Sequence, residues 1–371
     1  MKTSDTVTII FVFFIVIGLV IILTAPSRNL TSELSKDNLL KKIAAVDDGE
    51  VSGKKAPELQ GISGYINTNS EEIKLRDFIG KKVILIDFWT YTCINCIRTL
   101  PYLKQWDEKY RSEGLQIIGV HTPEFEFEKN YDNVKKAVEQ NELKYPIVQD
   151  NDYLTWRAYE NHYWPAKYLI DKNGNIVYMH FGEGAYEQTE AKIQELLADI
   201  KDSPVKKEIS MPSEVETVQY QGIGTPELYF GYKFKRSPLG NEPVFMNAGE
   251  SYDFNYNYDS AASTSLSPNR PYLEGKWKNN EDNFELVNDN GRIILYYKAK
   301  NVNIVAGSAG NTASGKNSSK IIVSVDGKNP RELAIRGFDI YRIVEGKDYE
   351  PHVLELDISG RGFMIYTFTF G

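Results

Sequence analysis

Two cysteines separated by two residues place the strongest constraint on how this chain folds. Cys93 and Cys96 are the only cysteines among 371 residues, so cysteine does not provide a structural framework here. The run before them, Val83–Phe88, is apolar apart from Asp87 and predicts a buried strand. Apolar residues then recur at helical spacing: Ile97, Leu100, Leu103, Trp106 and Tyr110. We therefore expect Cys93 at the start of a helix, where unpaired N–H groups and the helix dipole favour a thiolate.

Length and charge narrow the classes of function. A chain of 371 residues predicts two or three domains, with enough apolar residues for a core in each. The formal net charge is −8 and no basic cluster interrupts it, which argues against nucleic acid as a partner.

An uncharged run of 17 residues, Val7–Leu23, stands near the N-terminus. It is at the short end for a membrane-spanning helix and somewhat long for the core of a signal peptide. Because Pro26 directly after Ala25 makes a poor cleavage site, we predict a single uncleaved transmembrane helix within residues 1–26, with a cleaved signal as the alternative. Residues 27–55 are polar and mixed in charge, which is typical of a spacer.

Strand and helix patterns alternate from residue 56 to residue 202. The order, beginning with the strand and helix around the cysteines, is strand, helix, strand, helix, strand, strand, helix. It predicts an α/β domain whose helices cover both faces of a small sheet. Beyond the first strand and helix, the segments are Leu115–His121, a helix through Val134, Ala137 and Val138, Tyr145–Val148, Ala166–Asp171, Asn175–Phe181, and a helix through Ile193, Leu196, Leu197 and Ile200.

The texture of the sequence changes after a polar linker, residues 203–214. Residues 215–371 show no helical period, and Gly, Asn and Ser cluster between short β-rich runs. This texture predicts an all-β sandwich. The predicted strands are Leu228–Phe234, Tyr252–Tyr258, Arg292–Lys298, Ile321–Val325, Ile340–Val344, Val353–Ile358 and Phe363–Phe370.

The C-x-x-C spacing suits redox chemistry. Two intervening residues let one helical turn bring both sulfurs within disulfide reach while the first remains exposed. A zinc site needs two more ligands, but no other cysteine exists and the four histidines are scattered. We therefore favour a redox-active Cys93–Cys96 disulfide without a further cofactor, followed by a structural disulfide and then by a metal site.

Several motifs resemble known proteins. The run ILIDFWTYTCINC, with Pro101 five residues later, resembles thioredoxin, which has an Asp, a Trp, the C-x-x-C and a Pro at the same offsets. The motifs WTYTCINCIRTLPYL, GVHTPEFEFEK, YWPAKYLIDKNG and FGEG together resemble the extracytoplasmic part of DipZ proteins, and TPELYFGY and YTFTFG extend this resemblance to Gly371. The resemblance implies a thioredoxin-like domain followed by a jelly-roll-like β-sandwich similar to carbohydrate-binding modules.

The resemblance also implies a location and partners. It predicts a reductase of protein disulfides, attached to the cell membrane and facing out of the cytoplasm. DipZ itself carries a multi-helix electron-transferring membrane domain, whereas a single apolar run stands in its place here. A separate membrane electron donor of the CcdA or DsbD type is therefore expected. The residues between the cysteines, Ile94 and Asn95, do not decide whether the pair acts as reductant or oxidant.

Roles follow for the matching residues. Cys93 is the expected nucleophile, and Cys96 the cysteine that resolves the mixed disulfide. Asp87, between Ile86 and Phe88, is expected to be desolvated, with a raised pKa that suits it to take a proton from Cys96 through a water. The alternative is an ordinary Asp at a strand end, bonded to backbone.

Five further residues, Trp89, Tyr91, Glu124, Trp164 and Pro165, are expected to contact the substrate protein. Pro165 stands where thioredoxins place a cis-proline, so the resemblance implies a cis Trp164–Pro165 bond, although a trans bond is the default. Trp89 and Tyr91 are expected at the rim of the thiol site, with a core position as the alternative for Trp89. Glu124 is expected near the thiols, or else in a solvated loop.

Two other functions compete with this interpretation. Thr90 stands three residues before Cys93, as in the T-x-x-C of peroxiredoxins, which favours a thiol-dependent peroxidase. The proline expected further upstream in that family is replaced by Ile86. Alternatively, the tyrosines of the β region, among them Tyr252, Tyr256 and Tyr258, favour a module that binds cell-wall glycan, although such residues also serve as core and cross-strand pairs.

Overall fold

The computed structural model describes residues 53–69, 71–201, 205, 207–213, 218–234, 238–241, 247–255, 266–308 and 319–371. They all belong to one unit, Glu50–Gly371, which contains two sheets. The predicted transmembrane helix and nearly all of the predicted spacer lie outside the described residues. Within the ranges given above, no helix is both long and apolar enough to cross a membrane. The predicted limits of the domains and of the linker stay predictions.

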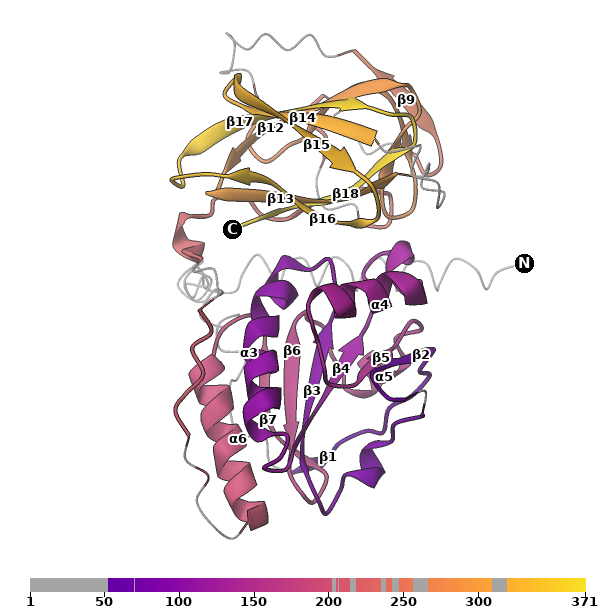
Figure 1. The fold of residues 1–371 in the computed structure, drawn as a ribbon. Helices are drawn as coiled ribbons and strands as arrows, with labels where there is room; N and C mark the ends of the chain where they lie inside the picture. Colours follow the sequence, from indigo (N-terminus) through magenta and orange to yellow (C-terminus); the bar gives the residue numbers. More distant parts are fainter. Residues whose placement is uncertain are drawn as a thin grey trace, which may run out of the picture. The chain divides into compact units, whose positions relative to one another are not determined.

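The first sheet has seven strands in the order β1-β7-β6-β3-β4-β5-β2 (Figure 1). The central strand β3 pairs in parallel with β4 and antiparallel with β6. Its strands are β1 (Lys54–Lys55), β2 (Gly64–Ile66), β3 (Val83–Trp89), β4 (Leu115–His121), β5 (Ile147–Gln149), β6 (Ala166–Ile170) and β7 (Asn175–Phe181). The helices of this region are α3 (Ile94–Tyr110), α4 (Tyr131–Gln140), α5 (Leu154–Ala158) and α6 (Tyr186–Lys201), with short 3-10 turns η1 (Leu75–Asp77) and η2 (Glu126–Lys129).

Strand β3 is buried along its whole length because both faces of the sheet are covered. Successive side chains of a strand point to opposite faces. Leu85 and Trp89 pack with residues of α3, α4 and α6, whereas Ile84 and Phe88 pack on the other face with Trp156 of α5. By this alternation Asp87 points to the face that α3 covers. The apolar run thus delivers one carboxylate beneath the helix that carries the cysteines.

The predicted order of elements in this region is confirmed. Strands Leu115–His121 and Asn175–Phe181 have the predicted limits. The sequence did not predict β1, β2 or α5. These elements are only two to five residues long, too short to show a period, and the first two lie at the edges of the sheet.

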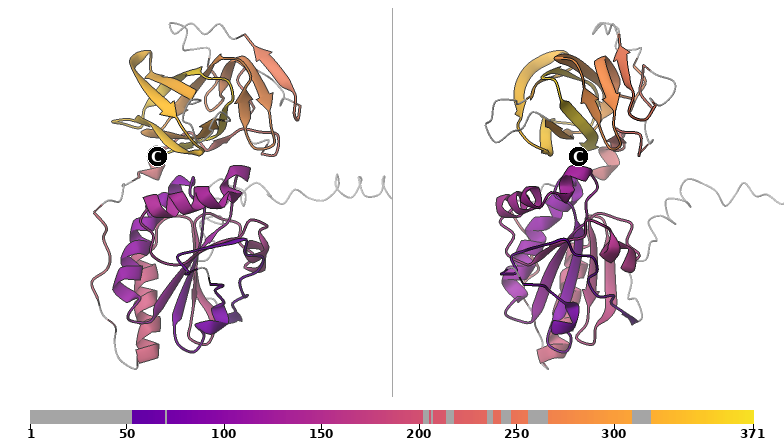
Figure 2. Two further views of the ribbon diagram at one scale, coloured as in Figure 1. Left: turned by 45° about the vertical axis from the view of Figure 1, so that its right-hand side comes forward. Right: turned by 90° about the vertical axis from the view of Figure 1, so that its right-hand side faces the viewer.

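The second sheet consists of eleven antiparallel strands and curls into a near-barrel (Figure 2). The path is β15-β14-β17-β12-β10-β11-β18-β13-β16, with β8 added to β18 and β9 to β10. A 3-10 turn, η3 (Tyr220–Gly222), precedes it. Its strands are β8 (Leu228–Tyr229), β9 (Ser251–Phe254), β10 (Tyr272–Asn279), β11 (Phe284–Leu286), β12 (Asn290–Lys298), β13 (Asn301–Ser308), β14 (Ser319–Val325), β15 (Lys328–Ile335), β16 (Asp339–Glu345), β17 (Pro351–Ser359) and β18 (Phe363–Phe370).

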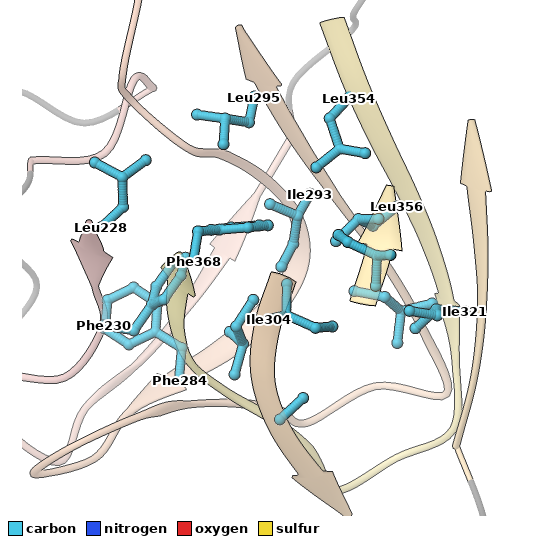
Figure 3. Packing of buried hydrophobic residues seen from close by; sticks show 14 of the residues in the cluster. Leu228, Phe230, Phe284, Ile293, Leu295, Ile304, Ile321, Leu354, Leu356 and Phe368 are labelled. Carbon is cyan, nitrogen blue, oxygen red and sulfur yellow. The ribbon is translucent and has the colours of Figure 1, made fainter. Parts of the chain in front are cut away.

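The predicted all-β fold of this region is confirmed, and its strands form a single connected network rather than two unconnected sheets. Strand β10 joins its two halves, because Tyr272–Glu274 pair with β12 and Gly275–Lys278 pair with β9. Gly275 stands at the change of partner, with a φ of +90° that favours glycine. The apolar side chains of both halves meet in one core (Figure 3).

Four strands of this region were not predicted: β10, β11, β13 and β15. Strand β10 carries three charged residues and a glycine, and β15 is an exposed edge strand whose sequence is mostly polar. Neither shows the alternation that marks a half-buried strand. Two of the predicted strands are shorter than expected, because β8 ends at Tyr229 and β9 ends at Phe254.

Candidate active site

Both cysteines lie at the N-terminus of α3. Cys93 is the N-cap residue, and its Sγ accepts a hydrogen bond from the backbone N–H of Cys96 at 3.4 Å. Both residues are free thiols; Cys93 is half-buried, whereas Cys96 is 1% exposed. A protein substrate can therefore reach Cys93 but not Cys96.

The buried thiol of Cys96 is held in its neutral form. Burial raises its pKa well above the usual value, and the neighbouring Cys93 raises it further. The charge of Asp87 acts in the same direction. Cys96 therefore needs a nearby proton acceptor before it can act as a nucleophile.

Asp87 lies on the face of the sheet that α3 covers. It is 1% exposed, and neither carboxylate oxygen has a hydrogen-bond partner among the described residues. Burial raises its pKa to about 7, and Lys167 opposes this rise. Lys167 is Asp87's neighbour on β6, is fully buried, and donates to the carbonyl of Gly182 at 3.4 Å. Asp87 thus has the predicted raised pKa, and its carboxylate does not form the backbone hydrogen bonds of the alternative interpretation.

The Trp164–Pro165 bond is cis, as expected. Pro165 directly precedes β6, whose Ala166 pairs with Phe88 of β3. It therefore lies near the C-terminal end of β3, from which the chain leads to Cys93. The indole N–H of Trp164 donates to the carbonyl of Thr122 at 3.0 Å. The half-buried ring of Trp164 and the half-buried Cys93 pack against the same hydrophobic cluster.

The other three predicted contact residues are Trp89, Tyr91 and Glu124. Trp89 and Tyr91, expected at the rim, are 1% and 4% exposed. The ring of Tyr91 stacks on His121 with centroids 5.7 Å apart, and its hydroxyl donates to the carbonyl of Phe338 at 3.5 Å. Glu124 hydrogen-bonds to Tyr229 through its side chain. Contact of these three residues with a substrate protein, and an influence of Glu124 on the thiols, stay predictions.

Sequence reasoning missed two buried titratable residues beside the thiols. His121 pairs with Trp89 across β3 and β4, and its Nε2 lies 3.4 Å from Oγ1 of Thr90. Burial lowers its pKa to about 3, so the ring is neutral at physiological pH. Its place at the end of the predicted strand Leu115–His121 was the signal that could have located it.

Glu128 is the second missed residue. Its fully buried carboxylate accepts hydrogen bonds from the hydroxyl of Thr92 at 2.5 Å and from the backbone N–H groups of Glu124 and Phe125 at 2.6 and 3.0 Å. Burial raises its pKa, and these hydrogen bonds oppose the rise. The alternation of Phe and Glu in FEFEK suggests a surface strand, so no signal in the sequence pointed to a buried carboxylate.

Of the three tyrosines considered for glycan binding, only Tyr252 lies within the described residues. Tyr252 is half-buried, and its hydroxyl donates to the carboxylate of Glu250 at 2.9 Å. Tyr256 and Tyr258 lie outside the described residues. Glycan binding therefore stays a prediction.

Comparison with known proteins connects this geometry to a family. Residues 225–371 match the family described as "Thioredoxin like C-terminal domain", and residues 52–179 match the AhpC/TSA family. Protein DipZ of Mycobacterium tuberculosis is 38% identical over 325 residues, covering 85% of this chain and 43% of DipZ. The chain thus spans less than half the length of this relative.

Two shorter relatives are covered over most of their length. Thiol-disulfide oxidoreductase ResA of Bacillus cereus is 33% identical over 39% of this chain and 78% of its own length. Thiol-disulfide oxidoreductase YkuV of Bacillus subtilis is 29% identical over 38% of this chain and 94% of its own length. A solvent-accessible thiol, a buried thiol and a buried carboxylate on one face of β3 and α3 are the groups that such an enzyme needs. The chain, which is DipZ-like over most of its length, therefore belongs to the family of thioredoxin-like thiol-disulfide oxidoreductases.

Proposed function

We propose that this chain is a membrane-anchored reductase of protein disulfides that works outside the cytoplasm. The observation that carries the proposal is the pairing of an accessible Cys93 with a buried Cys96, which lies on the face of the sheet to which Asp87 points. The resemblance to DipZ and the apolar run Val7–Leu23 support the location.

In the first step, the thiolate of Cys93 attacks one sulfur of a substrate disulfide. The substrate S–S bond breaks, a mixed disulfide with Cys93 forms, and the departing substrate thiolate takes a proton from solvent. The N-terminus of α3 favours the negative charge on the attacking sulfur.

In the second step, Cys96 resolves the mixed disulfide. Its thiol gives a proton to the carboxylate of Asp87, directly or through a water, and the resulting thiolate attacks Sγ of Cys93. The mixed disulfide breaks and the second substrate thiolate leaves. The substrate has gained two electrons, and the chain holds a Cys93–Cys96 disulfide.

A further turnover requires a dithiol donor that reduces this disulfide. We propose a separate membrane protein of the CcdA or DsbD type, because the chain has no cysteines beyond the pair itself. Protein thiols and disulfides are the proposed substrates.

A trapping experiment in the native cell tests this function. Cys96→Ser removes the second step, so the full-length protein should accumulate as a mixed disulfide on Cys93 with its substrate proteins. Cys93→Ser is the matched control and should trap none. Capture of only unrelated abundant proteins would argue against a dedicated reductase.

A thiol-dependent peroxidase is the second candidate. The match of residues 52–179 to the AhpC/TSA family and the Thr90-x-x-Cys93 spacing favour it. The hydroxyl of Thr90, however, lies within 3.4 Å of His121 Nε2 and so is engaged away from the substrate. Rapid consumption of hydrogen peroxide by the reduced full-length protein would favour this function over the first.

A further inference from the structure

Glu128 is a buried carboxylate that neither proposed step uses. It lies in η2, 35 residues after Cys93, and its side chain is inaccessible to solvent. A buried carboxylate is unfavourable unless it is hydrogen-bonded. Its donors include Thr92 through its hydroxyl, and Glu124 and Phe125 through their backbone N–H groups.

These donors come from the two segments that flank the thiol site. Thr92 directly precedes Cys93, so one oxygen of Glu128 holds the segment that presents the nucleophile. The other oxygen holds the start of the loop that follows Thr122 and Pro123. The carbonyl of Thr122 in turn accepts the indole N–H of Trp164, the residue before the cis-proline.

Hydrogen bonds and the backbone between them therefore connect Cys93 to Trp164 through Glu128. The loop between them is fixed at further points, because Thr122 donates to the carbonyl of Trp89 at 3.0 Å and its hydroxyl donates to Asp150 at 3.3 Å. Glu128 thus links Thr92, which directly precedes Cys93, to the loop that begins at Thr122. A carboxylate suits this position because it accepts several hydrogen bonds and needs to donate none.

We propose that Glu128 is a positioning residue that sets the separation between Sγ of Cys93 and the Trp164–Pro165 segment. This inference rests on the proposed function. A polypeptide disulfide must contact both the nucleophile and the cis-proline segment at once, whereas a small disulfide needs only the nucleophile. Loss of Glu128 should therefore slow reaction with polypeptide disulfides and spare reaction with small ones, because misplacement of reacting groups by about 1 Å can lower rates roughly a hundredfold.

The test measures two rates for the reduced full-length protein. One is the reduction of a disulfide-bonded polypeptide such as insulin, and the other is the reaction of Cys93 with a small aromatic disulfide. In Glu128→Ala the polypeptide rate should fall about tenfold or more, while the small-disulfide rate stays within about twofold of the parent protein. A loss shared equally by both rates, or no loss in either, would overturn the proposal.

Two sets of variants separate positioning from general damage to the fold. Glu190 is an equally buried carboxylate of the same domain, which accepts hydrogen bonds from Trp106 and Tyr110 on α3. Glu190→Ala should lower the unfolding midpoint and keep the ratio of the two rates unchanged. If Glu128→Ala does not fold, Thr92→Val is the alternative, because it exchanges only the hydroxyl for a methyl group. It should lower the polypeptide rate about fivefold. Thr92→Ser keeps the hydroxyl and should react at the parent rate.

The same data distinguish this proposal from the proposed function. Failure of the parent protein to reduce any polypeptide disulfide, with a normal small-disulfide rate, would count against the reductase function itself. A normal parent rate with no selective loss in Glu128→Ala and Thr92→Val would count against the role of Glu128 alone.

Discussion

The interior of the first sheet and the interior of the second sheet differ in the polar groups that they bury. Around β3, Asp87, Trp89, His121 and Tyr145 each leave a buried polar atom without a hydrogen-bond partner among the described residues. The core of the second sheet is dominated by one large cluster of hydrophobic side chains, among them Leu273, Trp277, Leu295 and Leu356. Buried polar groups without partners destabilise a fold.

This difference suggests that the first region carries the chemistry and that the second region contributes mainly to stability. The first region keeps an unpaired carboxylate with a pKa near 7 on the face that carries a buried thiol, an arrangement that suits proton transfer and weakens the fold. The second region has a large hydrophobic cluster in its interior, which stabilises the fold. Removal of the unpaired Asp87 carboxylate and removal of an apolar side chain from the second core should therefore change stability in opposite directions.

The largest effect on stability is expected in the core of the second sheet. Leu356 of β17 is fully buried and pairs with Ile293 of β12 and Val323 of β14. Leu356→Ala should lower the free energy of unfolding by about 2–5 kcal/mol, because it removes apolar contacts and leaves a cavity. Chemical denaturation followed by circular dichroism measures this loss. A change below about 1 kcal/mol would mean that this core does not support the fold as described.

The opposite sign is expected for Asp87. Its pKa is about 7 in the folded chain and near 4 when unfolded, so the folded state binds the proton more tightly. Stability should therefore fall as pH rises from about 4 to about 7. Asp87→Asn should raise the free energy of unfolding at pH 7 by up to ~4 kcal/mol and have no effect below pH 4. Denaturation at both pH values checks this, and a variant less stable than the parent at pH 7 would contradict it.

A smaller loss is expected at the bend of β10. Gly275 has a φ of +90°, and a Cβ there would lie 3.0 Å from the carbonyl oxygen of Asn290. Gly275→Ala should destabilise the protein by about 1–3 kcal/mol through backbone strain. Gly53→Ala is the control, because Gly53 also has a positive φ but a Cβ there would meet no atom within 4 Å. Its loss therefore reports backbone strain without a close contact. Equal losses in both would show that the close approach to Asn290 contributes nothing.

The smallest effect is expected on the surface of the second sheet. Lys320 and Glu332 form an ion pair at 2.9 Å across β14 and β15, with 58% of each side chain exposed. Glu332→Gln should change the free energy of unfolding by no more than about 0.5 kcal/mol, since exposed ion pairs contribute little. A loss above 1 kcal/mol would show that surface charge, and not only the apolar core, stabilises this region.

The parts of the site that lie close together in sequence could be predicted. Asp87, Cys93 and Cys96 fall within ten residues, where the change from strand to helix is visible in the pattern of apolar residues. Pro165 lies far along the chain and was located by family resemblance, because spacing alone does not show that a bond is cis.

Groups defined by contacts between distant segments could not be predicted. Lys167 stands in the run AKYLI and Glu128 in the run FEFEK, and it is the fold that buries both charged groups beside β3 and the cysteine segment. The link between the halves of the second sheet was missed for a related reason. Strand β10 changes partner at Gly275, and its charged residues hide the alternation on which strand prediction depends.

The rate at which Cys96 resolves a mixed disulfide on Cys93 tests most directly whether the unpaired carboxylate serves catalysis. A preformed mixed disulfide between Cys93 and a peptide would be followed across pH 5–9 in the parent protein and in Asp87→Asn. We predict that the parent rate rises through an inflection near pH 7, and that the variant loses this inflection and is slower by at least about tenfold at pH 7. Identical rates and pH profiles in the two proteins would contradict the role of Asp87 as proton acceptor.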